Sequence, residues 1–185
     1  TCCEKTAMID CGMAYCGEQM IENTKKYLGD RKLDYVFITH THYDHMGALP
    51  YIRREWPEAK VVGSRKAKTV FEREGAIRTI KRLGTEAQHT YSKSKNEIPV
   101  EGLAVDIVVS EGDKVSLGEQ YIYVLEAKGH TDCCLCYILE PAGLMFACES
   151  TGVVEEDQDV CSAILKSYSD SIESAHKCKA YGAKR

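Results

Sequence analysis

Three histidines and one aspartate fall within six consecutive positions: His40, His42, Asp44 and His45. Imidazole nitrogens and carboxylate oxygens are donors that bind zinc, iron and other divalent metals in proteins. Alternate residues of an extended segment point to the same side, so His40 and His42 can converge on one ion. Asp44 and His45 can then turn toward a second ion. The spacing therefore favours a metal site over an ordinary polar surface loop.

Two residues much further along the chain could add ligands. His130 follows a glycine after a predicted strand at 120–127, and Glu149 follows a predicted strand at 144–147. A lone histidine after a glycine is usually a turn residue, and a glutamate at the end of a strand is usually solvated. Each is weak evidence by itself. His130 and Glu149 can act as ligands only if the fold places them next to the His40–His45 run.

Buried strands are predicted immediately before the first ligands. Residues 33–39 form an apolar run that leads into His40, and a shorter run at 4–10 ends at Asp10. The remaining pattern predicts helices at 18–28, 46–54, 64–83 and 160–181, strands at 60–63, 105–109, 114–117, 120–127, 135–139 and 144–147, and a loop at 84–102. Strand–helix units at both ends and a strand-rich middle predict an α/β sandwich of sheets flanked by helices.

The last predicted helix, at 160–181, has apolar residues at helical spacing. The residues expected to face inward are Ile164, Leu165, Tyr168, Ile172 and Ala175. His176 lies among serine, glutamate and lysine residues of the same helix, so we expect it to be a solvated surface residue.

The composition indicates one globular domain. Of the 185 residues, 44% are hydrophobic and 28% are charged. The net charge of −4 argues against charge-driven binding to nucleic acid, and no apolar run approaches the ~20 residues that span a bilayer. We therefore expect a small-molecule substrate, no nucleic-acid partner and no membrane partner, and the composition does not indicate an oligomeric state.

Ten cysteines are many for this length. Cys2–Cys3 and Cys133–Cys134 are adjacent pairs, an arrangement that does not suit a disulfide framework. No second C-x-x-C is present to complete a four-cysteine zinc site. We therefore expect free, mostly buried thiols in a cytoplasmic protein.

Taken together, the motifs resemble those of a known family. Asp10, the His40–His45 run, His130 and Glu149 occur in the order found in hydrolase-like members of the metallo-β-lactamase fold superfamily. The H-x-H-x-D-H motif is highly specific, and the other motifs support it. The resemblance implies an αββα sandwich of two mixed β-sheets flanked by helices, with the metals at one edge between the sheets. It also implies that residues 1–185 form a single domain that is incomplete at both ends.

The resemblance implies two divalent metal ions, with zinc as the first candidate and iron or manganese as alternatives. It implies six ligands: His40, His42 and His130 for the first ion, Asp44 and His45 for the second, and Glu149 in the place of the bridging carboxylate. Asp10 would steady the metal-binding loop from outside the ligand set. Asp44 would also be the catalytic residue, because a metal-bound carboxylate can orient the attacking water and take its proton.

Two features depart from the family pattern. The bridging residue of the family is commonly aspartate, and the longer arm of Glu149 could bridge both ions, bind one of them or change the metal preference. The family also supplies a last histidine ligand on a strand after the final helix. This sequence ends at Arg185 and has only His176 in that region. We therefore expect the second metal site to be incomplete in this chain.

The implied function is hydrolysis by a metal-activated water. Ester, thioester, lactone, amide and phosphoester bonds are all candidates. Segment 64–102 is expected to be an insertion that forms the substrate region, because loops over a site carry specificity. Its basic residues could meet an anionic substrate or could form a solvated helix face: they are Arg65, Lys66, Lys68, Arg73, Arg78, Lys81 and Arg82.

Three other functions are compatible with the motifs. Di-iron oxidoreductases that reduce oxygen or nitric oxide share this fold, but they typically carry a carboxylate at the place of His42. A β-lactamase proper is the second alternative, and the Asp44–His45 pair argues only against the subgroup that has arginine in the second position. A non-enzymatic relative that binds a partner is the third, and the complete His40–His45 run argues against it.

Overall fold

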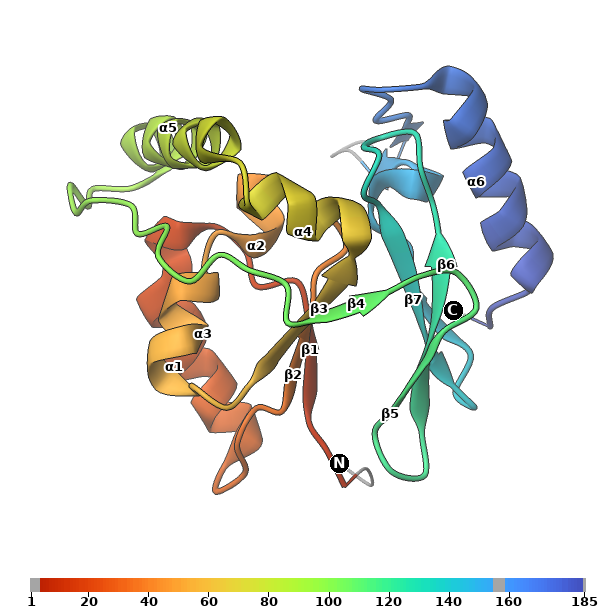
Figure 1. Ribbon diagram of the computed structural model, residues 1–185, viewed down its shortest axis with the longest axis horizontal. Helices are drawn as coiled ribbons and strands as arrows, with labels where there is room; N and C mark the ends of the chain where they lie inside the picture. Colours follow the sequence, from red (N-terminus) through yellow and green to blue (C-terminus); the bar gives the residue numbers. More distant parts are fainter. Residues whose placement is uncertain (1–3, 155–158, 185) are drawn as a thin grey trace.

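The protein folds into four layers in the order helix, sheet, sheet, helix (Figure 1). The computed structural model describes residues 4–154 and 159–184. Helices α1 (Gly17–Leu28) and α3 (Leu49–Glu55) cover the outer face of the first sheet, and α6 (Tyr168–Tyr181) covers the outer face of the second. The predicted αββα sandwich is therefore confirmed.

The first sheet is parallel throughout its four described strands. Their order is β1 (Ala7–Ile9), β2 (Tyr35–Phe37), β3 (Lys60–Ser64), β4 (Ile107–Val109). Parallel strands that are covered on both faces are expected to be apolar without alternation, and Val36 and Phe37 of β2 are indeed both fully buried. Because the strands run in one direction, the segments that follow β1 and β2 meet at the same edge of the sheet.

The second sheet is antiparallel throughout its four described strands. It consists of β5 (Lys114–Ser116), β6 (Tyr121–Glu126), β7 (Leu135–Glu140) and β8 (Leu144–Phe146), in chain order. Strands β6 and β8 therefore run in the same direction, and the segments that follow them lie at one edge. Those segments carry the predicted ligands of this half of the chain.

Side chains between the two sheets form a continuous core and join the sheets near the ligand run. The Tyr137 ring packs edge-on against Phe37, with ring centroids 5.1 Å apart, and its hydroxyl donates a hydrogen bond of 2.9 Å to the carbonyl of Ile38. The Leu135 N–H donates a 2.9 Å hydrogen bond to the carbonyl of Thr39. The start of the His40–His45 run is thus fixed by the second sheet as well as by the first.

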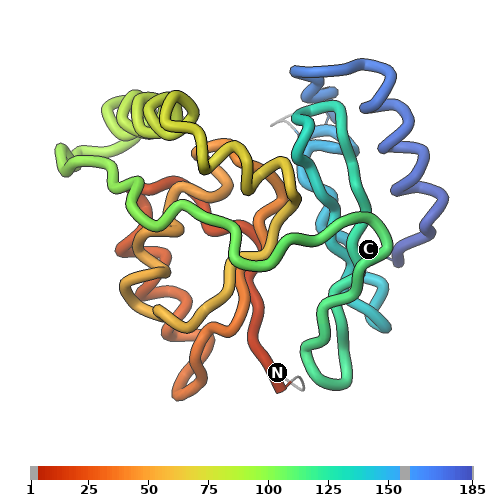
Figure 2. The backbone as a smooth tube through the Cα atoms, viewed as in Figure 1, coloured from red at the N-terminus to blue at the C-terminus, as the bar shows by residue number. Residues whose placement is uncertain are grey.

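Two helices occupy the segment for which the sequence predicted one helix and a loop. α4 (Arg65–Phe71) is followed by α5 (Glu74–Tyr91), so the loop predicted at 84–102 is wrong as far as Tyr91. Residues 92–106 then return without helix or strand from α5 to β4 (Figure 2). No helix in the described part of the chain is both long and apolar enough to cross a membrane.

Gly84 explains why the loop was predicted to begin inside α5. It is buried within α5, and a Cβ placed there would lie 3.3 Å from Cγ2 of Ile98. The glycine therefore allows the returning chain to pack closely on the helix, whereas the sequence pattern suggested a helix end.

The last predicted helix begins later than expected. Residues Val160–Cys161 form strand β10, which pairs with β9 (Val153–Val154), and α6 starts after Ser167, whose hydroxyl accepts a hydrogen bond from the N–H of Asp170. The expected inward face is also wrong in part, because Leu165, Tyr168 and Ile172 are exposed. The buried positions of α6 are Ser174 and Cys178.

The inward face of α6 is small and polar for a structural reason. The Ser174 hydroxyl donates a 2.7 Å hydrogen bond to the carbonyl of Lys128, so the helix docks against a loop backbone as well as against apolar side chains. Hydrophobic periodicity cannot detect such a face.

The described cysteines are free thiols. Five of these eight are buried, as the sequence predicted, and they are Cys11, Cys133, Cys134, Cys136 and Cys178. Cys2 and Cys3 lie outside the described residues.

Candidate metal centre

Asp10 connects the end of β1 to the histidine run. Its backbone adopts a left-handed conformation with φ 51°, which aspartate tolerates better than most residues. Its carboxylate accepts 2.7 Å hydrogen bonds from the N–H and from the hydroxyl of Thr39, and it lies 2.8 Å from Nδ1 of His45. Asp10 therefore fixes both the backbone before His40 and the ring orientation of His45.

A short helix, α2 (Tyr43–Met46), presents Asp44 and His45. The carbonyl of His45 accepts hydrogen bonds from the N–H groups of Cys11 and Gly12, at 2.7 and 3.1 Å. Next to it, a Cβ on Gly47 would lie 2.8 Å from the backbone nitrogen of Ala14, so only glycine fits this close contact between the two loops. The backbone around the candidate ligands is thus rigidly held.

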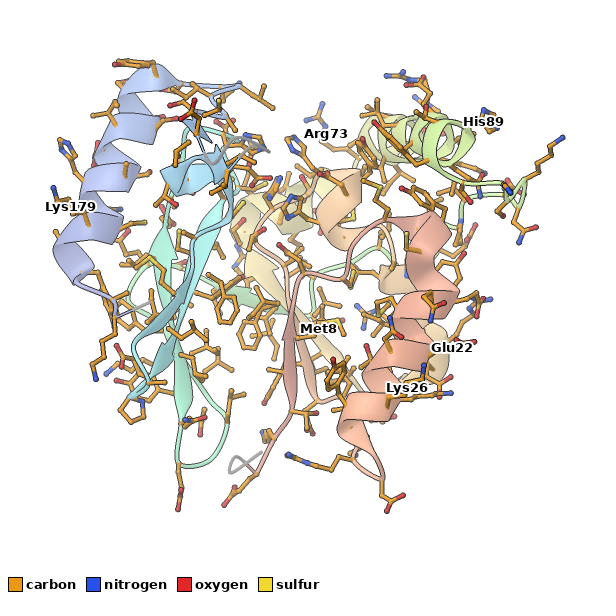
Figure 3. The ribbon with its side chains drawn as sticks, turned by 180° about the vertical axis from the view of Figure 1, so that it is seen from behind. Met8, Glu22, Lys26, Arg73, His89 and Lys179 are labelled. Atoms are coloured by element: carbon orange, nitrogen blue, oxygen red, sulfur yellow. The ribbon has the colours of Figure 1, made fainter. Side chains whose placement is uncertain are left out.

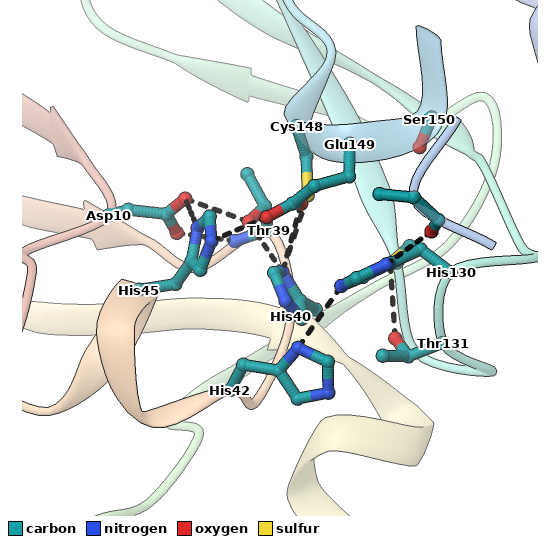
Figure 4. A network of polar contacts seen from close by, with 12 residues as sticks. Asp10, Thr39, His40, His42, His45, His130, Thr131, Cys148, Glu149 and Ser150 are labelled. Atoms are coloured by element: carbon teal, nitrogen blue, oxygen red, sulfur yellow. Dashed lines mark hydrogen bonds and ion pairs between the residues drawn. The ribbon is translucent and has the colours of Figure 1, made fainter. Parts of the chain in front are cut away.

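His40, His42 and His130 form the first donor group (Figure 4). Their candidate ligand atoms lie within 4.8 Å of one another, and Nδ1 of His42 is 3.1 Å from Nε2 of His130. Two imidazole nitrogens that bind one tetrahedral zinc ion at ordinary bond lengths are about 3.4 Å apart. Nδ1 of His130 lies 2.6 Å from the carbonyl of Ala163, a contact that makes Nδ1 the donor and leaves Nε2 free to bind.

His40 provides the strongest indication that this group fits a metal ion. Its side chain is completely buried, and its Nε2 atom has no hydrogen-bond partner within the described residues. A buried polar atom without a partner costs about 1–3 kcal/mol. Burial, together with the neighbouring rings of His45 and His42, lowers the pKa of His40 to about 2, so the ring is neutral and offers a lone pair. A divalent ion would satisfy this atom.

The second donor group contains His40, His45, Cys148 and Glu149. Nε2 of His45 is 2.8 Å from Oε1 of Glu149, and Nδ1 of His45 is 2.8 Å from Asp10. Burial alone would lower the pKa of His45, but the hydrogen bonds to the two carboxylates raise it to about 10. Glu149 shows the reverse balance, since its hydrogen bond from His45 outweighs burial and lowers its pKa.

Asp44 lies beside these groups but belongs to neither. Its carboxylate is 3.6 Å from Nε2 of His45 and is 37% exposed. The structure therefore brings five of the six predicted ligands into the two groups and leaves Asp44 at their rim. The other two histidines, His89 and His176, are exposed and lie outside both groups; His89 is on the part of α5 that is farthest from α6 (Figure 3).

Cys148 is the member of the second group that the sequence did not indicate. It begins the short helix η2 (Cys148–Thr151), and its backbone is left-handed with φ 54°. Its Sγ lies 3.3 Å from Nδ1 of His40 and is hydrogen-bonded to the carboxylate of Glu149. A cysteine at an unusual backbone position next to Glu149 has no spacing signature, so only the three-dimensional structure reveals it.

An open cavity borders the first donor group. Its volume is about 410 Å³, and its lining includes His42 and His130. His42 is therefore partly accessible from this cavity, whereas His130 is buried and His40 is sealed from solvent.

Helix–sheet–sheet–helix layering with clustered imidazole and carboxylate donors at one edge defines a class of metal-binding protein. Residues 3–181 match the family described as the metallo-beta-lactamase superfamily, so the chain belongs to this family.

Named relatives and solved structures extend this result. Glyoxylase B2 of Dictyostelium discoideum is 25% identical over 145 residues, which are 74% of this chain and 45% of that protein. A nitric oxide reductase of Moorella thermoacetica is 36% identical over 64 residues, which are 35% of this chain and 16% of that protein. The chain thus spans less than half the length of these curated relatives.

An archaeal metallo-beta-lactamase superfamily protein of Sulfolobus tokodaii has the same fold. The TM-score is 0.73 at 21% identity, and the match covers 100% of this chain and 69% of the archaeal chain. At this identity the likeness establishes the fold alone.

Proposed function

We propose that the protein is a metal-dependent hydrolase that cleaves an ester, thioester, lactone, amide or phosphoester bond of a small molecule. The observation that carries this proposal is the Nε2 atom of His40, which has no partner within the described residues and lies in a three-histidine group beside an open cavity. Family membership agrees with it, because the superfamily consists largely of metal-dependent hydrolases.

In this proposal, His40, His42 and His130 hold a first ion and His45, Glu149 and Asp44 hold a second. Bound zinc, or iron or manganese in its place, would lower the pKa of a coordinated water and polarise the bond under attack. Asp10 orients His45 through the 2.8 Å contact described above, and the Ala163 carbonyl orients His130.

Asp44 is the proposed catalytic residue. Its partly exposed carboxylate stands at the rim of the donor groups, where it can orient the attacking water and accept its proton. An Asp44→Asn variant that keeps its metal content should therefore lose most of its hydrolytic rate. Full activity in that variant would remove Asp44 from the mechanism.

The metal content and the hydrolytic activity of the purified protein test the proposal. His40→Ala should lose the first ion and lower the rate of hydrolysis at least about a hundredfold, because no other described donor can replace a fully buried ring. His89→Ala is the matched control, since this exposed histidine lies outside both donor groups. The absence of a bound transition metal in the purified wild-type protein would contradict the proposal.

A di-iron oxidoreductase is the competing function, and the similarity to a nitric oxide reductase over 64 residues favours it. His42 argues against it, because the family resemblance implies a carboxylate at that position in such proteins. Iron content with a visible absorption band and oxygen consumption would support the oxidoreductase. Hydrolysis of a chromogenic lactam would instead support a β-lactamase.

A further inference from the structure

Two cavities meet at His42. We call the first the cationic cavity; its volume is about 410 Å³, and its lining includes His42, His130, Lys66, Arg73 and Lys166. The second, the apolar groove, has a volume of about 520 Å³. The two share four lining residues, namely Thr41, His42, Val70 and Leu165, so they adjoin. A molecule bound beside the first donor group can therefore extend into both.

The walls of the apolar groove are formed by helices α4 and α5 on one side and by Leu165 on the other. The helical residues that line it are Val70, Ala76, Thr79, Ile80 and Leu83. Leu165 is 69% exposed, although its apolar side chain borders the groove. A ligand with an apolar part would cover this leucine and thereby remove apolar surface from water.

Two of the cations that line the cationic cavity have no counter-ion among the described residues. Lys66 and Arg73 make no ion pair with any described residue, whereas Lys166 lies 3.7 Å from the carboxylate of Asp132. Arg73 lies at the end of α5 that is closer to α6 (Figure 3).

Three other basic residues of segment 64–102 differ from Lys66 and Arg73 in being paired. Arg78, Lys81 and Arg82 pair with Glu74, Glu97 and Glu86 on the solvent side of α5, and they do not line either cavity. Segment 64–102 therefore has both features that its sequence allowed: a solvated helix face, and cations that line the cavity and have no ion pair within the described residues.

We infer that the substrate is an anionic ester or thioester whose apolar part and anionic part lie on opposite sides of the scissile bond. The apolar part, a short alkyl chain, occupies the groove, and a carboxylate or phosphate pairs with Lys66 and Arg73. Water adds to the carbonyl carbon, the C–O or C–S bond breaks, and a carboxylic acid and an alcohol or thiol leave. This inference rests on the proposed hydrolase function and specifies its substrate.

Two matched substrate series test it on the zinc-loaded full chain. The first series consists of S-acyl derivatives of 3-mercaptopropionate with two to eight acyl carbons, and the second of the same thioesters with the carboxylate methylated. We expect kcat/KM to favour the anionic series about tenfold, and to rise up to about fourfold with each added methylene. An S-acyl mercaptoethyl phosphate series shows whether phosphate replaces carboxylate.

Matched variants assign each preference to its cavity. The double variant Lys66→Gln and Arg73→Gln should lower kcat/KM for the anionic series to the level of the neutral series. Lys68→Gln is its control, because Lys68 is on the same helix as Lys66 but lines neither cavity. Leu165→Ser should weaken the rise of kcat/KM with acyl chain length. Ile172→Ser is its control and should leave that rise unchanged, because Ile172 is an exposed apolar residue outside the groove.

The inference is overturned if anionic and neutral thioesters are hydrolysed equally, or if Lys68→Gln has the effect of the double variant. If the metal-loaded wild type hydrolyses none of the probes, the proposed function fails for this bond class. The inference about the two cavities is then tested by calorimetric measurement of the binding of the intact thioesters. Binding that weakens in the double variant and in Leu165→Ser supports it, and binding that is equal in all variants overturns it.

Discussion

At the scale of single residues, His45 is held between two carboxylates. Asp10 contacts one ring nitrogen and Glu149 the other, both at 2.8 Å, so the protonated ring forms two ion pairs in the metal-free protein. A proton and a metal ion therefore compete for the same side of this ring.

This arrangement predicts how the stability of the metal-free protein depends on pH. The pKa of His45 rises from 6.5 to about 10 on folding, so its contribution is complete below pH 6.5 and is lost as the pH rises through 10. We expect the Tm of chelator-treated protein to fall more between pH 7 and about 10.5 in the wild type than in His45→Gln. Parallel curves for the two proteins would show that the ion pairs contribute nothing.

Asp10 allows a second test at this scale. Asp10→Asn should weaken zinc binding about 10–100-fold without unfolding the chain, because it removes the charge that orients His45 but no ligand. Competition with a chromophoric chelator measures this. Asp34→Asn is the control: Asp34 accepts a 2.8 Å hydrogen bond from the N–H of Thr6, away from both donor groups, and should leave zinc affinity unchanged.

At the scale of elements, the docking of α6 determines the position of His130. The carbonyl of Gly129 accepts hydrogen bonds from the N–H groups of Lys166 and Ser167, and the next residue supplies the ring of the first donor group. Gly129 has φ 130°, and a Cβ there would lie 2.5 Å from the Cα of Ser171. This contact has no room for a side chain.

Gly129→Ala should therefore be severely destabilising. We expect a loss of about 2–4 kcal/mol in the free energy of unfolding, together with weaker zinc binding, because α6 and the His130 loop must separate. Urea denaturation measures the first effect. Gly112→Ala is the control, because Gly112 has φ 87° but open space where a Cβ would lie. It should lose only the cost of a positive φ in the free energy of unfolding, about 1–2 kcal/mol. Equal losses in the two variants would mean that the Ser171 contact is unimportant.

The elements also show what the sequence could and could not predict. Strands β2 and β6 are mainly apolar runs, and the His40–His45 run is equally a feature of consecutive residues, so both were predictable. The extent of α5 was not, because Gly84 reflects a contact with Ile98 that is distant in sequence. The exposure of Leu165 and the approach of Cys148 to His40 likewise depend on tertiary packing.

At the scale of the whole molecule, the candidate metal centre joins the two sheets. His40 and His42 follow β2 of the first sheet, whereas His130 and Glu149 follow strands of the second. An ion bound by both sets of ligands holds the halves of the sandwich together, in addition to the core around Phe37.

Metal removal should therefore lower the stability of the entire fold. A ligand that binds only the folded chain at a thousand times its Kd adds about 4 kcal/mol, so chelation should lower the calorimetric Tm by several degrees. The chelator should lower the Tm of His40→Ala by less than that of the wild type, because this variant lacks the first ion. His176→Ala, which changes an exposed residue outside both groups, should retain the full difference. A wild-type Tm that does not respond to the chelator would contradict this prediction.

The division of the three-histidine group between the two sheets also has a consequence for synthesis on the ribosome. His40 and His42 are made before His130, and strands β3 and β4 of the first sheet and helices α4 and α5 lie between them in the chain. A nascent chain with a folded amino-terminal half thus displays two imidazoles without the third. Stable capture of an ion by all three imidazoles would have to wait until β6 and the segment after it have been translated, when β7, β8 and α6 are still to be made.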